Sequence, residues 1–221
     1  MASLGDQVWR EVDASAVLLI PLGATEQHGP HLPLDTDAVI ASAIAVRAAV
    51  ETGATVAPVL AYGASGEHAD FPGTLSIGSD ALRHVLVELV RSASLTWSHI
   101  IFVNGHGGNH PTLTSAVEQM VDEGHDVAAW WPSVPGGDAH AGRTETSLML
   151  AIAPETVRLE LAEPGNTAAL AELLPQMQAG GVSAVSANGV LGDPAGASAE
   201  EGEALLVELV RSLVAAVESQ R

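Results

Sequence analysis

The chain has 221 residues, of which 47% are hydrophobic and only 3% aromatic, so its core must be built mainly from Ala, Val, Leu and Ile. Its formal net charge is −19, from 27 acidic and 8 basic side chains, and such a balance repels phosphate backbones and anionic lipid surfaces. We therefore expect neither a nucleic-acid partner nor a membrane partner. The lack of cysteine excludes disulfides, thiolate ligands and a cysteine nucleophile.

This length suffices for one well-buried domain, and we expect a single domain over residues 1–221. No apolar run approaches the ~20 residues that span a bilayer. Residues 1–10 also lack the basic patch and apolar core of a secretory signal. These features predict a cytoplasmic protein.

Short apolar runs alternate along the chain with segments of helical period. Strands are expected at residues 16–20, 54–60, 99–104 and 126–131. Helices are expected at 38–49, from a cap at Ser79 or Asp80 to about 90, from about 111 to 124, and at 148–153, 167–178 and 198–219. The alternation predicts an α/β fold, a three-layer α/β/α sandwich with a mainly parallel central sheet. An irregular lid or a subunit contact is expected late in the 164–196 stretch, which is rich in Gly, Pro, Ala and Asn.

Residues 21–37, directly after the first predicted strand, hold three acids, two histidines and no Lys or Arg. Carboxylates and imidazoles crowded together without a cation shift their pKa values until something neutralises them, and a bound metal ion does so. Glu26 and His28 are two residues apart, so at an extended strand end they point to one side. Asp37 lies at the start of the next helix, which can bring its carboxylate back toward Glu26 and His28.

Later loops that follow predicted strands add further candidates. His106 lies among glycines after the third strand, where the lack of side chains lets a substrate approach backbone N–H groups. Glu145 lies five residues after His140, beyond the fourth strand. Ligands bind beyond the carboxyl ends of parallel strands, so these residues are expected at one edge of the sheet. Imidazole and carboxylate without thiolate favour Zn, Mn or Fe(II).

Other interpretations of these residues are weaker. A dinucleotide fingerprint fails because His110 stands where its third glycine belongs, and no Gly-x-Ser-x-Gly elbow is present. Any one of these candidates, taken alone, is better explained as part of a capped turn or a hydrogen-bonded loop. Because four strand ends bring such residues to the same edge of the sheet, a shared site is the better explanation for the group. The remaining histidines divide into two groups. His84, His99 and His125 have no acidic companions and are expected to be structural or exposed, whereas His31, His110 and Asp35 are candidates to support the ligands.

Four segments together resemble the creatininase family of metal-dependent amidohydrolases. They are residues 26–37 (EQHGPHLPLDTD), 71–74 (FPGT), 104–109 (NGHGGN) and 140–147 (HAGRTETS). The resemblance covers most of the chain from about residue 17 to residue 160. It implies a layered α/β/α fold, a homo-oligomer (hexamer or octamer), and a centre of two divalent ions, Zn with Fe(II) or Mn, that hydrolyses C–N bonds. By this resemblance Glu26 and His106 serve one ion, His28 serves the other and Asp37 bridges them.

The chain departs from creatininase itself at Gly108, where that enzyme carries a metal-binding carboxylate. The resemblance therefore points away from creatinine and makes Glu145 the replacement ligand. Further segments, at 62–68, 130–132, 137–147, 162–166 and 188–193, are similar to a peptidase branch of the family. That branch removes a modified C-terminal unit derived from Val and Tyr from a small precursor peptide, which we expect as the substrate.

Within this hypothesis His140 is the candidate proton shuttle. The substrate side is expected to be formed by Ser65, Glu67, His68, Gly107, Gly108 and Asn109. Two alternatives stay open at this point. One is an amidohydrolase or deformylase that acts on a small cyclic or formylated amine, and the other is a noncatalytic metal- or ligand-binding protein.

Overall fold

A parallel sheet of four strands forms the centre of the computed structural model, which describes residues 3–220; residues 1, 2 and 221 of the expected domain lie outside the described residues. The strands are β1 (Leu18–Leu22), β2 (Thr55–Val56), β3 (Ile100–Asn104) and β4 (Val127–Trp130), in the spatial order β2-β1-β3-β4. Leu18 lies opposite Thr55 on one side and Ile100 on the other. Every residue of β1 and β3 is buried, as expected for strands covered on both faces.

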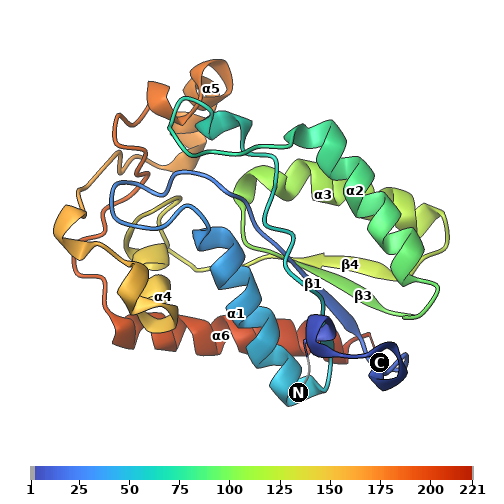
Figure 1. Cartoon of the computed structure of the whole chain (residues 1–221). Coiled ribbons are helices and arrows are strands. Elements are labelled where there is room, and N and C mark those ends of the chain that lie inside the picture. The colour runs from blue at the N-terminus through green and yellow to red at the C-terminus, as the bar shows by residue number, and fades with distance from the viewer. Residues whose placement is uncertain (1–2, 221) are drawn as a thin grey trace.

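Helices cover the two faces of this sheet (Figure 1). One face packs against α1 (Thr36–Thr52), α4 (Arg143–Ile152) and α6 (Ala199–Glu218), and the other against α2 (Gly78–Ala93) and α3 (His110–Asp122). Successive strand residues point to opposite sides, so Leu19 and Ile101 belong to the first core while Ile20 and Phe102 belong to the second. The three-layer α/β/α prediction is confirmed.

Helix α5 (Leu170–Gly180) stands apart from both cores. Its buried residue Leu173 belongs to a small apolar cluster with Val182 and Leu191. Figure 1 shows it at the same end of the molecule as the Gly66–His68 segment, which it contacts. The remaining short 3-10 helices are η1 (Leu4–Asp6), η2 (Trp9–Glu11), η3 (Gly66–His68), η4 (Gly107–Asn109), η5 (Pro154–Thr156), η6 (Leu159–Leu161) and η7 (Val182–Ala184).

Some element boundaries differ from the sequence prediction. The second strand is confined to residues 55–56, and Leu60 returns to β1 only through an isolated bridge to Leu22. The ladder slips by one residue between them: Ala57 donates to the carbonyl of Leu19, but the next donor, to the carbonyl of Pro21, is Leu60 rather than residue 59. The predicted cap at Ser79 or Asp80 is wrong, because α2 already begins at Gly78.

Helix α4 begins at Arg143, five residues before the predicted start at 148, so its polar first turn carries Glu145. The last helix begins close to its predicted position. The Oγ atom of Ser198 caps α6 by accepting a hydrogen bond from the N–H of Glu201, at 3.2 Å. Among the helices of residues 3–220, none is both long and apolar enough to cross a membrane.

Candidate metal centre and catalytic cavity

The predicted metal ligands meet at one edge of the sheet. Glu26 and His28 follow the end of β1, and His106 follows the end of β3. Asp37 lies in the first turn of α1 and Glu145 in the first turn of α4. Parallel strands and the two helix N-termini therefore deliver all five to one place, as the pattern of strand ends predicts.

Two further histidines join this group, His68 at the end of η3 and His140 just before α4. We call the seven residues the ligand cluster: Glu26, His28, Asp37, His68, His106, His140 and Glu145. All are buried except Glu145, which is half-buried. No Lys or Arg forms an ion pair with them among the described residues, so only imidazoles face the carboxylates.

Asp37 lies between two histidines. Its Oδ1 is 3.0 Å from His28 Nε2, and its Oδ2 is 3.3 Å from His106 Nδ1. Burial raises the pKa of Asp37, but the neighbouring charges of His28 and His106 outweigh burial and hold the pKa well below its ordinary value. Burial lowers the pKa of His28, yet the carboxylates of Asp37, Glu145 and Glu26 raise it to about 10. In the absence of a metal ion, protons on the imidazoles thus balance the buried carboxylates.

Glu26 is surrounded by the other histidines. Its Oε2 lies 3.2 Å from His106 Nε2, while its Oε1 lies 3.3 Å from His68 Nε2 and 3.8 Å from His140 Nδ1. Burial raises the pKa of Glu26, and the charge of His106 counters burial so that the net shift is downward. The pKa of His106 is shifted as well. Burial lowers it, but Glu26 and Asp37 raise it well above its ordinary value.

Glu145 joins the cluster beside His28. Its Oε2 accepts a hydrogen bond from the N–H of Ala141 at 2.6 Å and lies 3.9 Å from His28 Nε2. Burial raises the pKa of Glu145 to about 7, with Asp37 and Glu26 acting in the same direction and His28 against it. Ala141 itself has φ 52°, a left-handed conformation that a residue with a Cβ rarely adopts, which fits a constrained position at a functional site.

Gln27 organises two of the histidines, and the sequence interpretation missed it. Its Nε2 lies 2.8 Å from His68 Nδ1 and 3.0 Å from His140 Nε2, and its Oε1 accepts the N–H of Gly29 at 2.7 Å. Gly189 gives it room, since a Cβ there would overlap the Gln27 amide. The only sequence signal was its position between two candidate ligands.

This cluster fits a metal centre. Both carboxylate oxygens of Glu26 and Oδ2 of Asp37 are buried, yet they accept no hydrogen bond from the described residues. Three sets of ligand atoms lie within 4.8 Å of one another: Glu26/His28/Asp37, Glu26/His68/His140 and His28/His140/Glu145. Imidazole and carboxylate donors suit Zn, Mn and Fe(II). The cluster could therefore hold two divalent ions.

A cavity of about 380 Å³, which we call the catalytic cavity, opens onto the cluster at His68, His106 and His140. Of the predicted substrate-side residues, the structure brings Glu67, His68, Gly107 and Gly108 to its wall. The other two predicted residues, Ser65 and Asn109, lie behind this wall. Ser65 is fully buried, and the buried amide of Asn109 accepts the N–H of Ala64 at 2.8 Å and donates to the carbonyl of Gly23 at 3.0 Å.

The carboxylate beside Gly108 belongs to Glu67. Glu67 Oε1 lies 3.4 Å from His106 Nε2, and the side chain is 28% exposed, so it stands between the buried cluster and the catalytic cavity. The resemblance had named Glu145 as the substitute for a carboxylate at position 108. In space Glu145 lies beside His28 and Ala141, and Glu67 is the acid that reaches this loop.

Three further histidines lie outside the ligand cluster. His31 Nε2 lies 2.8 Å from Thr146 Oγ1 and so ties the first motif to α4. His110 stacks on Trp131, with ring centroids 4.0 Å apart. The expectation that His99 lacks an acidic companion is wrong, because its Nδ1 lies 2.8 Å from Asp126 Oδ2 in a partly exposed pair.

The family model described as creatinine amidohydrolase matches residues 6–217 of this sequence. The chain belongs to the creatininase family. Over 217 residues this creatininase-family chain is 53% identical to the mycofactocin precursor peptide peptidase of Mycolicibacterium smegmatis, with 95% of this chain and 87% of that protein aligned. The expectation of a hydrolase that acts on C–N bonds is confirmed at the level of the family.

Solved creatininase structures share the fold. The manganese form of creatininase superimposes with a TM-score of 0.84 at 27% identity, covering 98% of this chain and 97% of that one. A mutant creatininase of the Zn-Zn type gives a TM-score of 0.84 at 27% identity, covering 100% and 99%. These two descriptions name manganese and zinc. Imidazole and carboxylate donors, such as those of the ligand cluster, suit both metals.

Proposed function

We propose that this creatininase-family chain is a metal-dependent peptidase that cleaves a C-terminal Val-Tyr-derived unit from the mycofactocin precursor peptide. The observation that carries the proposal is its 53% identity, over 95% of its length, to a protein of that name. The site supports it, because a cavity opens directly onto a buried cluster in which three carboxylate oxygens accept no hydrogen bond from the described residues.

The ligand assignment is part of this proposal. Asp37 directs one oxygen toward His28 and the other toward His106, which supports a carboxylate that bridges two ions. Glu26 and His106 would serve one ion, and His28 with Glu145 would serve the other. Bound divalent ions would polarise the scissile carbonyl and lower the pKa of a nearby water molecule toward ~7.

His140 has the contacts of a proton carrier. Its Nε2 lies 2.8 Å from the carbonyl oxygen of Gln27, an acceptor, so this nitrogen carries the proton and Nδ1 is free to accept one. Burial, followed by the charge of His28, lowers the pKa of His140 to about 3, so the ring is neutral at pH 7. We infer that Nδ1 accepts a proton from the attacking water and delivers it to the leaving amine, a role commonly worth ~10²–10⁴ in rate.

The glycines of the loop after β3 provide donors for the substrate. Gly107 and Gly108 line the catalytic cavity, and their N–H groups have no acceptor among the described residues. Backbone N–H groups at such a place can hold a carbonyl oxygen or stabilise the oxyanion that forms when the carbonyl is attacked.

Further parts of the proposal concern the setting of the enzyme. We infer a cytoplasmic homo-oligomer, a hexamer or octamer, from the family resemblance. A precursor peptide as the substrate partner is consistent with the name of the 53% identical relative. The formal net charge of −19 disfavours nucleic acid and anionic membranes as partners.

The test is incubation of the metal-loaded protein with the modified precursor peptide and, separately, with creatinine, followed by mass spectrometry. The expected result is release of the C-terminal unit with creatinine left intact. Turnover of creatinine with an intact peptide would identify a small-amide hydrolase instead. A protein that binds metal but hydrolyses neither compound would support a binding function.

A further inference from the structure

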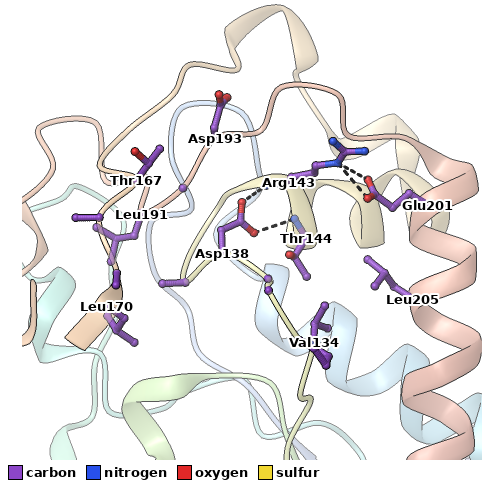
Figure 2. Close-up of a pocket in the computed structure, with 17 residues that line it drawn as sticks. Val134, Asp138, Arg143, Thr144, Thr167, Leu170, Leu191, Asp193, Glu201 and Leu205 are labelled. Carbon is purple, nitrogen blue, oxygen red and sulfur yellow. Dashed lines mark hydrogen bonds and ion pairs between the residues drawn. The ribbon is translucent and has the colours of Figure 1, made fainter. Parts of the chain in front are cut away.

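A second cavity has a volume of about 580 Å³ (Figure 2). It adjoins the catalytic cavity. The two cavities share Ala139, Leu170 and Leu191 in their walls. Leu191 also contacts the cluster through its backbone, because its N–H donates to the carbonyl of His140 at 2.9 Å. A molecule held at His140 can therefore continue past Leu170 and Leu191 into the second cavity.

Unused backbone donors line the second cavity. The N–H groups of Thr167, Ala169, Gly192 and Asp193 have no acceptor among the described residues; Gly192 is buried, whereas the other three residues are exposed and their N–H groups can bind water until a ligand replaces it. Buried N–H groups are nearly always paired in proteins. An extended peptide supplies the missing acceptors, since its carbonyl groups recur along the chain.

The charged side chains of this cavity, which include Asp193, all have hydrogen-bond partners within the protein; Asp193 Oδ1 accepts the N–H of Ala195 at 2.9 Å. Figure 2 shows Arg143 paired with Glu201, where Nε lies 2.8 Å from Oε2, and Asp138 turned toward the start of α4. Asp138 accepts hydrogen bonds from the N–H groups of Arg143 and Thr144. With these charges occupied, the walls offer backbone donors and the apolar surface of Leu170 and Leu191 rather than a site for a small ion.

We propose that the second cavity binds the precursor peptide on the N-terminal side of the scissile bond, as an extended main chain; this rests on the peptidase function proposed above. The unit that is released is derived from two residues and fits the catalytic cavity of about 380 Å³. The longer N-terminal part must leave the cluster along the surface. The larger cavity next to His140 provides that path.

Another path leads to the other side of α5. A third cavity of about 480 Å³ shares Glu67, Met177 and Gln178 with the catalytic cavity. Its charged lining residues are Glu67 and Asp70, without a basic residue among those described. The third cavity is the smaller of the two, and its described lining has no basic residue, whereas that of the second cavity includes Arg143, so we assign the N-terminal segment to the second cavity.

Three alanines give matched variants for a test. Ala168 is exposed and lines only the second cavity, Ala179 is exposed and lines only the third, and Ala171 is exposed on α5 and lines neither of them nor the catalytic cavity. Each is changed to Trp and assayed with the full-length precursor and with a short C-terminal fragment that carries the scissile bond. The Ala168→Trp variant is expected to raise KM for the full-length peptide at least 10-fold while leaving kcat/KM for the fragment unchanged. The other two variants should behave as the wild type with both substrates.

Binding gives a readout that is independent of turnover. The anisotropy of a fluorescent full-length precursor should show at least 10-fold weaker binding to metal-depleted Ala168→Trp than to metal-depleted wild type. Equal affinity and equal KM would overturn the proposal, and a loss confined to Ala179→Trp would reassign the path to the third cavity. If wild type cleaved neither peptide, the peptidase function would fail and this proposal with it. Cleavage of both by wild type and Ala168→Trp alike would remove only the cavity assignment.

Discussion

The carboxylate of Glu67 fills the space that a side chain at Gly108 would need. A Cβ atom built on Gly108 would overlap Glu67 Oε1 and His106 Nε2, and it would lie 2.7 Å from the carbonyl oxygen of Ala64. The family resemblance implies a carboxylate in creatininase at the position of Gly108, and in this chain a residue from a different loop brings a carboxylate there. The loop at 65–68 and the glycine loop after β3 are therefore interdependent.

Replacement of Gly108 by Ala is expected to destabilise the protein by ~1–3 kcal/mol, the usual cost of overpacking a tightly filled site. Chemical denaturation of the metal-free protein measures this loss. Gly107→Ala is the matched control, because a Cβ at that position meets no other atom within 4 Å. Equal stability of the two variants would contradict the proposed overlap.

The Gly108→Ala loss should shrink when Glu67 is also changed to Ala. Removal of the Glu67 carboxylate clears one of the overlaps, while the contact with the Ala64 carbonyl remains, so partial recovery is expected. A double-mutant cycle on unfolding free energy isolates the coupling between the two positions. Additive losses would mean that Glu67 does not occupy the space at residue 108.

The Asp37→Ala variant should lose its bound metal and, with it, activity by a factor of at least ~10³. The reason is that this one carboxylate contacts both His28 and His106. Metal analysis by mass spectrometry and peptide cleavage are measured on the same preparation. Asp35→Ala is the control, since Asp35 is exposed, precedes α1 and makes no side-chain cap. Full activity of Asp37→Ala without metal would refute a metal-dependent mechanism.

Sequence patterns predicted the parts of the fold that follow local physics. β1 and β3 are continuous apolar runs because both faces of the sheet are covered, and their ends bring Glu26 and His106 together. The predicted second strand is too long because an apolar composition extends to Leu60, whereas the hydrogen-bonded ladder slips by one residue between Ala57 and Leu60. The start of α2 was misplaced for a similar reason: a good capping residue does not fix the position at which the helix begins.

The contacts within the site depend on long-range folding that no local pattern reveals. Gln27 and His68 are 41 residues apart in sequence and hydrogen-bond only because η3 folds over the first motif. Glu67 approaches Gly108 in the same way. Residue types and strand ends therefore identified the ligand cluster, while the residues that orient it emerged only from the structure.

Metal binding at pH 7.5 should release protons. Without metal, the pKa of His28 is raised to about 10, so the imidazole is protonated at this pH, whereas a metal ligand must be neutral. Glu145, with its pKa raised to about 7, is partly protonated and adds a fraction of a proton. The pKa of His106 is also raised well above its ordinary value, so this ligand loses a proton as well. Calorimetric titration with zinc in buffers of different ionisation enthalpy measures the number released, expected to be about two. Binding enthalpies that do not depend on the buffer would contradict this charge assignment.

Gln27→Ala should lower kcat about 10–100-fold, as expected when a residue that orients metal-site histidines is removed. The Gln27 amide donates a hydrogen bond to His68 Nδ1, and its nitrogen lies 3.0 Å from His140 Nε2, whose proton is directed to the Gln27 backbone carbonyl. Loss of the side chain therefore frees the His68 ring and removes a packing contact of the His140 ring. Because Gln27 contributes no carboxylate or imidazole, metal content should fall less than in Asp37→Ala. Gln119→Ala, which removes a half-buried glutamine that accepts a hydrogen bond from Arg83, is the control and should match the wild type. The informative comparison is with His140→Ala: if Gln27 acts by orienting His140, its removal in a His140→Ala background should cost much less than in the wild type. Fully additive losses would show that Gln27 acts on catalysis by another route.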